Sequence, residues 1–207
     1  ASSSDFTIDP GLWVLDNFGT KLIALIYNNK CFEWDAAATN ATATRATVIA
    51  NAPTASRHVL VSTPDRHLVF FGTETTVGSQ SSQDAMFIRF SDQENINSYT
   101  PTATNTAGTQ RLADGSKIIG TLRGRNGNYI WSDTALYQMQ LIGAPLVFGF
   151  TQLGAKCGSA GLHAAIDVNG TAYWMGRDSF FGFDGKVSKI PCSVEDYVFG
   201  DIDEASQ

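Results

Sequence analysis

The chain is poor in charged residues. Only 16% of its 207 residues are Asp, Glu, Lys or Arg, and its formal net charge is −6. A protein that binds nucleic acid regardless of sequence needs a basic face that displaces counterions from the phosphates. The composition therefore argues against a general nucleic-acid binder, although hydrophobic residues, at 43%, suffice to build a core.

Cysteine is also scarce. Cys31, Cys157 and Cys192 make an odd number and show no CxxC spacing. This pattern argues against a zinc site and against a disulfide framework, so we expect reduced and mostly buried thiols.

Long apolar runs are missing too. No stretch approaches the roughly 18 apolar residues of a membrane-spanning helix. The polar start at residues 1–4 lacks the basic region of a signal peptide. Because the chain does not begin with Met, we expect it to be a piece of a longer polypeptide, or a trimmed one.

Turn signals and aromatic strands dominate what is present, most clearly in residues 169–185. Asn169-Gly170 favours a type I′ hairpin turn, since both residues accept a positive φ. The aromatic segment 172–175 then reads as a strand, 176–179 as a turn, and 180–183 as a further strand closed by Asp184-Gly185. The stretch predicts consecutive short antiparallel strands.

The same pattern occurs earlier in the chain at a fixed distance. The paired positions, each 43 residues apart, are Asn126 with Asn169, Gly127 with Gly170, Trp131 with Trp174, and Tyr137 with Phe180. A repeat of about 40–45 residues with four strands is typical of propeller blades. We therefore predict that Trp131 and Trp174 are buried at equivalent places in adjacent sheets.

The whole chain is predicted to be all-β, with β-propeller-like blades of short antiparallel strands and long polar loops. The approximate blades are residues 12–35, 57–90, 116–150 and 162–187, which form one domain, or part of one, over residues 1–207. One short helix is expected at 193–199, with Ser193 as its N-cap and Gly200 after its end.

Three longer segments are expected to be loops: residues 36–56, 72–84 and 91–115. Loops of this length are uncommon in compact domains and are often functional. The last of them carries two apolar anchors, Ile96 and Tyr99, followed by Pro101 and Asn105. We predict that this loop contacts neighbouring subunits.

Three stretches carry a resemblance to a known group of proteins. They are WVLDNFG at 13–19, RFSDQEN at 89–95 continuing through YTPTATNTAG at 99–108, and YWMGRD at 173–178. Together they resemble bacteriophage virion proteins with β-propeller-like domains, which in short-tailed phages form the tail nozzle or other tail-tube parts.

The resemblance implies a structural protein of the virion, assembled in the cytoplasm of the bacterial host. It implies a homo-oligomeric ring, often a hexamer, that contacts other tail or portal and adaptor proteins and lets DNA pass through its lumen. It implies no enzymatic chemistry, and because the residues offer no complete ligand set we also expect no cofactor and no metal. A net negative conduit is consistent with this role, because it does not grip phosphates.

The densest positive region could approach passing DNA. Arg123 and Arg125 flank a predicted hairpin tip, with Arg111 and Lys117 upstream. We expect a lumen-facing or phosphate-near tip at Arg123 and Arg125, with a solvated turn or a salt bridge to a neighbouring subunit as the alternative.

Enzyme and metal signatures are incomplete. His67 follows Asp65 closely, which could set a carboxylate beside an imidazole, but no G-x-S-x-G supplies a nucleophile. His58, His67 and His163 are expected to be structural. Residues 167–170 start like a calcium loop but lack its later ligands, so a hairpin turn is favoured. Nothing pairs the carboxylates that a glycosidase would need, those of Glu33, Asp35, Asp65, Asp92 and Glu94.

A second function class stays open, that of a carbohydrate-binding or host-receptor-binding propeller. Tyr99, Tyr137 or Phe181 exposed together on one face would favour glycan binding. The same residues buried between subunits would favour assembly. For the tryptophans Trp13, Trp34, Trp131 and Trp174, core packing is the expected role and sugar stacking the alternative.

Overall fold

The computed structural model describes residues 12–63, 65–143 and 145–201, and this part of the chain is all-β with one short helix. Its strands form four antiparallel sheets of four strands, each a simple meander in chain order. The predicted fold class is confirmed to this extent. No helix in the described ranges is long and apolar enough to cross a membrane.

The first two sheets occupy the N-terminal half. Sheet 1 contains β1 (Trp13–Phe18), β2 (Lys21–Ile26), β3 (Cys31–Asp35) and β4 (Thr47–Val48). Sheet 2 contains β5 (His58–Ser62), β6 (His67–Phe71), β7 (Phe87–Phe90) and β8 (Gly108–Arg111). Short 3₁₀ turns, η2 (Ala41–Ala43) and η3 (Gln80–Ser82), lie in their longer connections.

The other two sheets follow. Sheet 3 contains β9 (Ile118–Gly124), β10 (Gly127–Ser132), β11 (Ala135–Gly143) and β12 (Val147–Ala155). Sheet 4 contains β13 (Ala165–Val168), β14 (Thr171–Met175), β15 (Phe180–Phe183) and β16 (Val187–Lys189). The helix α1 (Glu195–Gly200) comes last.

Three predicted elements need correction, two loops and the helix. The segments 36–56 and 91–115 are not wholly loop, because they hold β4 and β8, the fourth strands of sheets 1 and 2. The helix also begins one residue later than predicted. Val194, not Ser193, is its N-cap, no side chain caps it, and Gly200 is its last residue.

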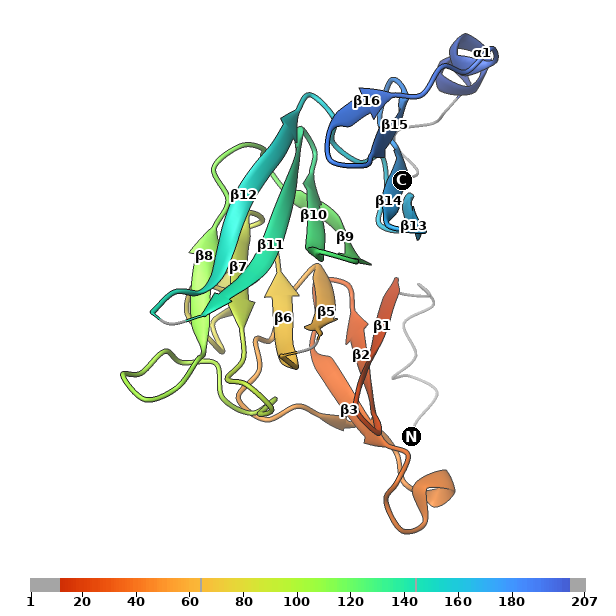
Figure 1. The fold of residues 1–207 in the computed structure, drawn as a ribbon. Helices are drawn as coiled ribbons and strands as arrows, with labels where there is room; N and C mark the ends of the chain where they lie inside the picture. Colours follow the sequence, from red (N-terminus) through yellow and green to blue (C-terminus); the bar gives the residue numbers. More distant parts are fainter. Residues whose placement is uncertain (1–11, 64, 144, 202–207) are drawn as a thin grey trace.

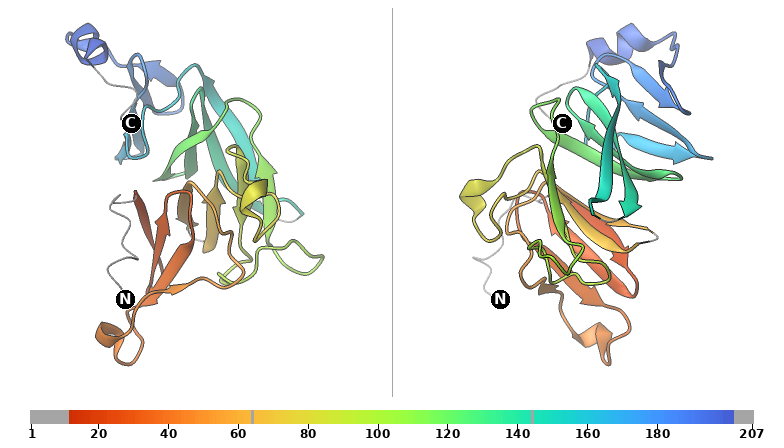
Figure 2. Two further views of the ribbon diagram at one scale, coloured as in Figure 1. Left: turned by 180° about the vertical axis from the view of Figure 1, so that it is seen from behind. Right: turned by 60° about the vertical axis from the view of Figure 1, so that its left-hand side comes forward.

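The four sheets fan out around their first strands (Figure 1). β1 lies beside β5, β5 beside β9, and β9 beside β13, while no comparable contact joins β13 to β1 within the described residues. The two views of Figure 2 likewise place sheets 1 and 4 at opposite ends of the fan. The described sheets therefore form an open stack.

Three apolar cores fill the spaces between consecutive sheets. The first joins sheets 1 and 2 and contains Val14, Ile23, Leu25, Val59 and Phe70. The second joins sheets 2 and 3 through Leu60, Val69, Phe71, Ile130 and Met139. The third joins sheets 3 and 4 through Tyr129, Trp131, Leu136, Trp174 and Phe181. Because side chains alternate between faces, sheet 2 contributes to two cores, and every residue of β5 and β6 is buried.

Trp131 and Trp174 are both buried, as predicted, but their places are not equivalent. Gly127 and Thr171 each open the second strand of their sheet after a two-residue turn, so the structural repeat is 44 residues (127 to 171) rather than 43. A slip of one residue turns a side chain to the other face. The two indoles therefore point toward each other, with ring centroids 5.4 Å apart in the third core.

Of the two Asn-Gly turns in the repeat, only the one in sheet 4 has the type I′ geometry. Asn169 and Gly170 have φ of 55° and 88°, as a type I′ turn requires. Asn126 keeps a negative φ, so the corresponding turn of sheet 3 is of another type.

The thiols are free, with Cys31 and Cys157 buried and Cys192 partly buried. Burial raises the pKa of Cys31 to about 12.

Candidate functional site

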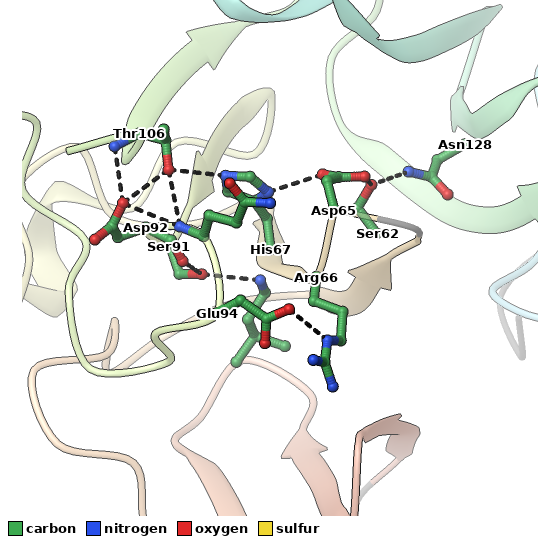
Figure 3. Close-up of polar contacts among 11 residues, drawn as sticks. Ser62, Asp65, Arg66, His67, Ser91, Asp92, Glu94, Thr106 and Asn128 are labelled. Carbon is green, nitrogen blue, oxygen red and sulfur yellow. Dashed lines mark hydrogen bonds and ion pairs between the residues drawn. The ribbon is translucent and has the colours of Figure 1, made fainter. Parts of the chain in front are cut away.

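A chain of polar side chains crosses the second sheet and is centred on His67, at the start of β6 (Figure 3). His67 Nδ1 lies 2.8 Å from Asp65 Oδ2, and its Nε2 lies 3.1 Å from the Thr106 hydroxyl. The imidazole is only 1% exposed. The sequence prediction that Asp65 stands beside this imidazole is confirmed.

Each end of this chain continues into a neighbouring segment. Thr106 donates its hydroxyl proton to Asp92 Oδ1 over 2.7 Å and accepts the backbone N–H of Gln93. On the other side, the Ser62 hydroxyl donates to Asp65, and Asn128 of β10 donates to the Ser62 oxygen over 3.0 Å. The network thus ties the 91–107 loop, the β5–β6 turn and sheet 3 together.

Hydrogen-bond counting fixes the direction of the protons. Asp65 is an acceptor, so His67 Nδ1 carries a proton. The Thr106 hydroxyl donates to Asp92 Oδ1, and the same Thr106 oxygen contacts His67 Nε2, so Thr106 links the imidazole to the second carboxylate. His67, Asp65, Thr106 and Asp92 all have hydrogen-bond partners in this network, which stabilises the fold.

Both carboxylates are held in their ionised form. The backbone N–H of Thr106 is the main cause of the lowered pKa of Asp92. Burial by itself raises the pKa of Asp65, but the hydrogen bond from His67 and those that follow outweigh it and lower the pKa. The stabilisation from these two groups is present above their ordinary pKa near 4 and is lost as the pH falls below it.

The order carboxylate, imidazole, hydroxyl is that of a catalytic triad, but its surroundings do not suit catalysis. A nucleophilic hydroxyl must reach a substrate, and its base must take its proton. The Thr106 hydroxyl already gives its proton to Asp92 and accepts from Gln93. The imidazole is closed off from solvent. We interpret the cluster as structural.

An open polar cleft of about 570 Å³ lies beside the cluster, between sheets 2 and 3. Its floor includes the buried Ser62, Asp65 and Asn128, and its rim includes Arg125 and Gln140. The floor groups hydrogen-bond one another. Among the residues that the structure describes, no aromatic side chain lines this cleft.

The long loops are tied to the core by a second buried polar residue, Arg89 of β7. Its guanidinium donates to the carbonyls of Tyr99, Glu74 and Thr75, the last at 2.7 Å. Glu74 in turn accepts the backbone N–H of Thr54 at 3.0 Å and that of Gly78 at 2.6 Å. Burial lowers the pKa of Arg89, and the negative charge of Glu74 opposes that shift.

The predicted subunit-contact residues are therefore placed differently from expectation. Ile96 and Tyr99 are buried in the first core of their own chain, with Tyr99 packed edge-on against Phe70. They anchor the loop and offer no contact surface. Pro101 is exposed, and Asn105 bonds to Thr100 and Thr102 within the loop. Only the segment around these last two residues remains a candidate contact.

The two arginines of the predicted basic tip, Arg123 and Arg125, have different surroundings. Arg123 makes an ion pair with Asp16 of β1 at 2.7 Å and donates to the Val61 carbonyl. It joins three sheets near the centre of the fan, so its charge is neutralised within the chain. Arg125 is exposed at the rim of the polar cleft.

The aromatic residues that would have formed a glycan platform are buried. Tyr99, Tyr137 and Phe181 are at most 5% exposed and lie in three different cores. Trp34 donates to carbonyls of the 41–44 segment, and Trp13 is exposed on β1. The expectation of a core role is thus wrong for Trp13.

Metal-binding groups are not assembled within the described ranges, where no three His, Cys, Asp or Glu side chains come together. Residues 167–170 form a hairpin turn in which Asp167 accepts the Gly170 N–H.

Of the carboxylates weighed for glycoside hydrolysis, Glu33 pairs with Lys21 and Glu94 with Arg66. Asp35 accepts the Thr20 hydroxyl.

His58 offers a measurable pH dependence. It is buried, with Nδ1 2.8 Å from the Thr121 hydroxyl, and burial followed by the nearby charge of His163 lowers its pKa from 6.5 to about 3. Between these two pKa values, His58 binds a proton in the unfolded chain but not in the native chain. We predict that stability falls as the pH drops below about 6.5, by up to about 1.4 kcal/mol per pH unit.

Urea titrations at pH 7, 6 and 5 measure this effect above the range where carboxylates titrate. His58→Gln is expected to flatten the slope, while His163→Gln, at an exposed position, leaves most of it. An NMR titration in which the His58 ring protonates near pH 6.5 in the native protein would contradict the prediction.

Comparison with known proteins does not extend this description. No protein-family model matches the chain, and no curated protein is similar to it.

Proposed function

We propose that this chain is a structural component of a phage virion, of the tail nozzle or tail-tube kind. Copies of it form a ring around a passage for DNA and contact other tail, portal or adaptor proteins. The role is one of assembly and not of catalysis. The three sequence stretches that resemble phage virion proteins lie in β1, in the loop after β7, and in β14 with its following turn.

One observation carries the assembly role. Trp13 and Leu15 at one end of the stack and Ile166, Val168 and Tyr173 at the other are large, apolar and exposed. A soluble monomer rarely leaves such surfaces open, and they are typical of interaction sites. A chain that buries them by association is a building block.

The electrostatics are consistent with a passage for DNA. The net charge is −6. Near the centre of the fan the guanidinium of Arg123 is already paired with Asp16. A net negative chain does not hold phosphates by counterion release over its whole surface, so a passing duplex is not retained.

Negative-stain electron microscopy of the purified chain tests this function. We expect ring-shaped class averages with an open centre. Particles of uniform monomer size would contradict the proposal. A parallel glycan array is expected to give no binding, because the candidate platform aromatics are buried.

A further inference from the structure

The two end sheets differ from the middle ones in how their strands are buried. In β1, Val14 lies in the first core, so its neighbours Trp13 and Leu15 point to the opposite face, where they are 50% and 60% exposed. In β14, Ala172 and Trp174 lie in the third core, and Tyr173 between them is 40% exposed. Each end sheet thus has one packed face and one open face.

Register extends both open faces over a neighbouring strand. Leu15 is opposite Ala24, and Trp13 is opposite Ile26, so the open face of sheet 1 continues across β2. Tyr173 is opposite Ile166, which is 60% exposed, so the open face of sheet 4 continues onto β13.

The charges on these strands lie on the wrong side for solvent-facing sheets. By alternation, Asp16, Lys21 and Asp167 share the packed faces, whereas the outward positions of β1, β2, β13 and β14 hold no charged residue. An antiparallel sheet that faces water on one side normally shows the reverse pattern. Depletion of charge is what the centre of a protein interface shows.

We propose that the open face of sheet 4 packs against the open face of sheet 1 of a second copy. The open face of sheet 1 is defined by Trp13, Leu15, Leu22, Ala24 and Ile26, and the open face of sheet 4 by Ile166, Val168 and Tyr173. The inference rests on the proposed function, because it takes the partner to be another copy of this chain.

The packing within the chain is the reason for choosing a second copy. The stack repeats one kind of contact three times, with the face of one sheet against the facing side of the next. In sheet 4, the face turned away from sheet 3 is free. In sheet 1, the face turned away from sheet 2 is free. Joining them between copies continues the same uncharged sheet-on-sheet packing.

The contact is head-to-tail, so it uses two different patches and generates a ring or a filament. The polar loops at 72–84 and 91–107 then lie outside the main interface, in agreement with their attachment to Arg89 of their own chain. Assembly depends on the sheets and not on those loops.

Two single variants test the two patches separately. Leu15→Glu places a charge on the open face of sheet 1, and Ile166→Glu places one on that of sheet 4. Both positions are exposed in the monomer, so folding is expected to persist, as circular dichroism checks. Each variant alone is expected to associate at least about 100-fold more weakly than the unmodified chain, because a buried unpaired charge is costly.

Mixing the variants gives the sharpest readout. Leu15→Glu keeps an intact sheet 4 face, and Ile166→Glu keeps an intact sheet 1 face. An equimolar mixture is therefore expected to form a two-chain complex in native mass spectrometry, although each variant alone stays monomeric. If either variant misfolds, Leu15→Arg and Ile166→Arg repeat the test, and complex formation itself demonstrates folding.

Leu146→Glu is the matched control. Leu146 is apolar and 69% exposed but belongs to the β11–β12 connection, away from both end faces. It is expected to assemble normally. Suppose that the unmodified chain assembles. If Leu15→Glu and Ile166→Glu then leave the mass of the assembly unchanged, or if their mixture forms no complex, the face assignment is wrong while the proposed function stands. If the unmodified chain is monomeric, both fail.

Discussion

Replacing Trp174 with alanine is expected to lower the free energy of unfolding by about 3–5 kcal/mol, the range for removing a buried aromatic side chain. The indole is 3% exposed, stacks on Phe181, meets Trp131, and donates its N–H to the Cys157 carbonyl over 2.8 Å. The substitution opens a cavity between sheets 3 and 4 and leaves that carbonyl without its donor.

A urea titration followed by circular dichroism measures the loss. Tyr197→Ala serves as the control, because Tyr197 is an exposed aromatic on α1, where truncation is expected to cost within about 0.5 kcal/mol. A loss below about 1 kcal/mol for Trp174→Ala would show that the third core does not hold sheet 4 in place.

Replacing Arg89 with methionine is expected to cost about 3 kcal/mol, because three backbone carbonyls lose a charged donor in a buried setting. These carbonyls belong to Glu74, Thr75 and Tyr99, so both long loops lose their attachment to β7. We expect new protease cleavage within residues 72–84 and 91–107.

Arg89→Lys separates charge from geometry. A lysine ammonium is a point charge and does not reproduce the planar fork of a guanidinium, so only part of the stability should return. Limited proteolysis followed by mass spectrometry locates the cuts. Loops as resistant in Arg89→Met as in the unmodified chain would contradict the role given to Arg89.

The strands were predictable where turn chemistry and alternation agree. Asn169-Gly170 and the aromatic segments after it predicted β14 and β15 almost to the residue. β4 and β8 could not be found in this way. They are outer strands without a buried apolar stripe, and Thr47 and Val48 are both exposed. Their hydrogen-bonding partners, and not their own sequences, make them strands.

The repeat shows how a small error in register changes the meaning of a residue. The matched letters are 43 apart, but the hairpins are 44 apart (127 to 171), so Trp131 and Trp174 meet instead of occupying equivalent places. Identical residues at matched positions cannot by themselves reveal this one-residue shift, because the face on which a side chain lies depends on where each turn closes.

The polar clusters depend on contacts between distant segments. Asp65 and His67 are neighbours in sequence and were foreseen, whereas Thr106 reaches His67 from 39 positions away. Arg89 likewise binds carbonyls of loops before and after it. Ile96 and Tyr99 were correctly seen as apolar anchors, but nothing local indicates that they anchor to their own chain.

The central claim is that the open stack of four sheets is a building block that associates with its own copies. Sedimentation velocity of the unmodified chain over a range of concentrations tests it most directly. The account predicts species at multiples of the 22.3 kDa chain mass that grow in proportion as the concentration rises. A single species at the mass of one chain up to tens of micromolar, the range in which even weak interfaces associate, would contradict it.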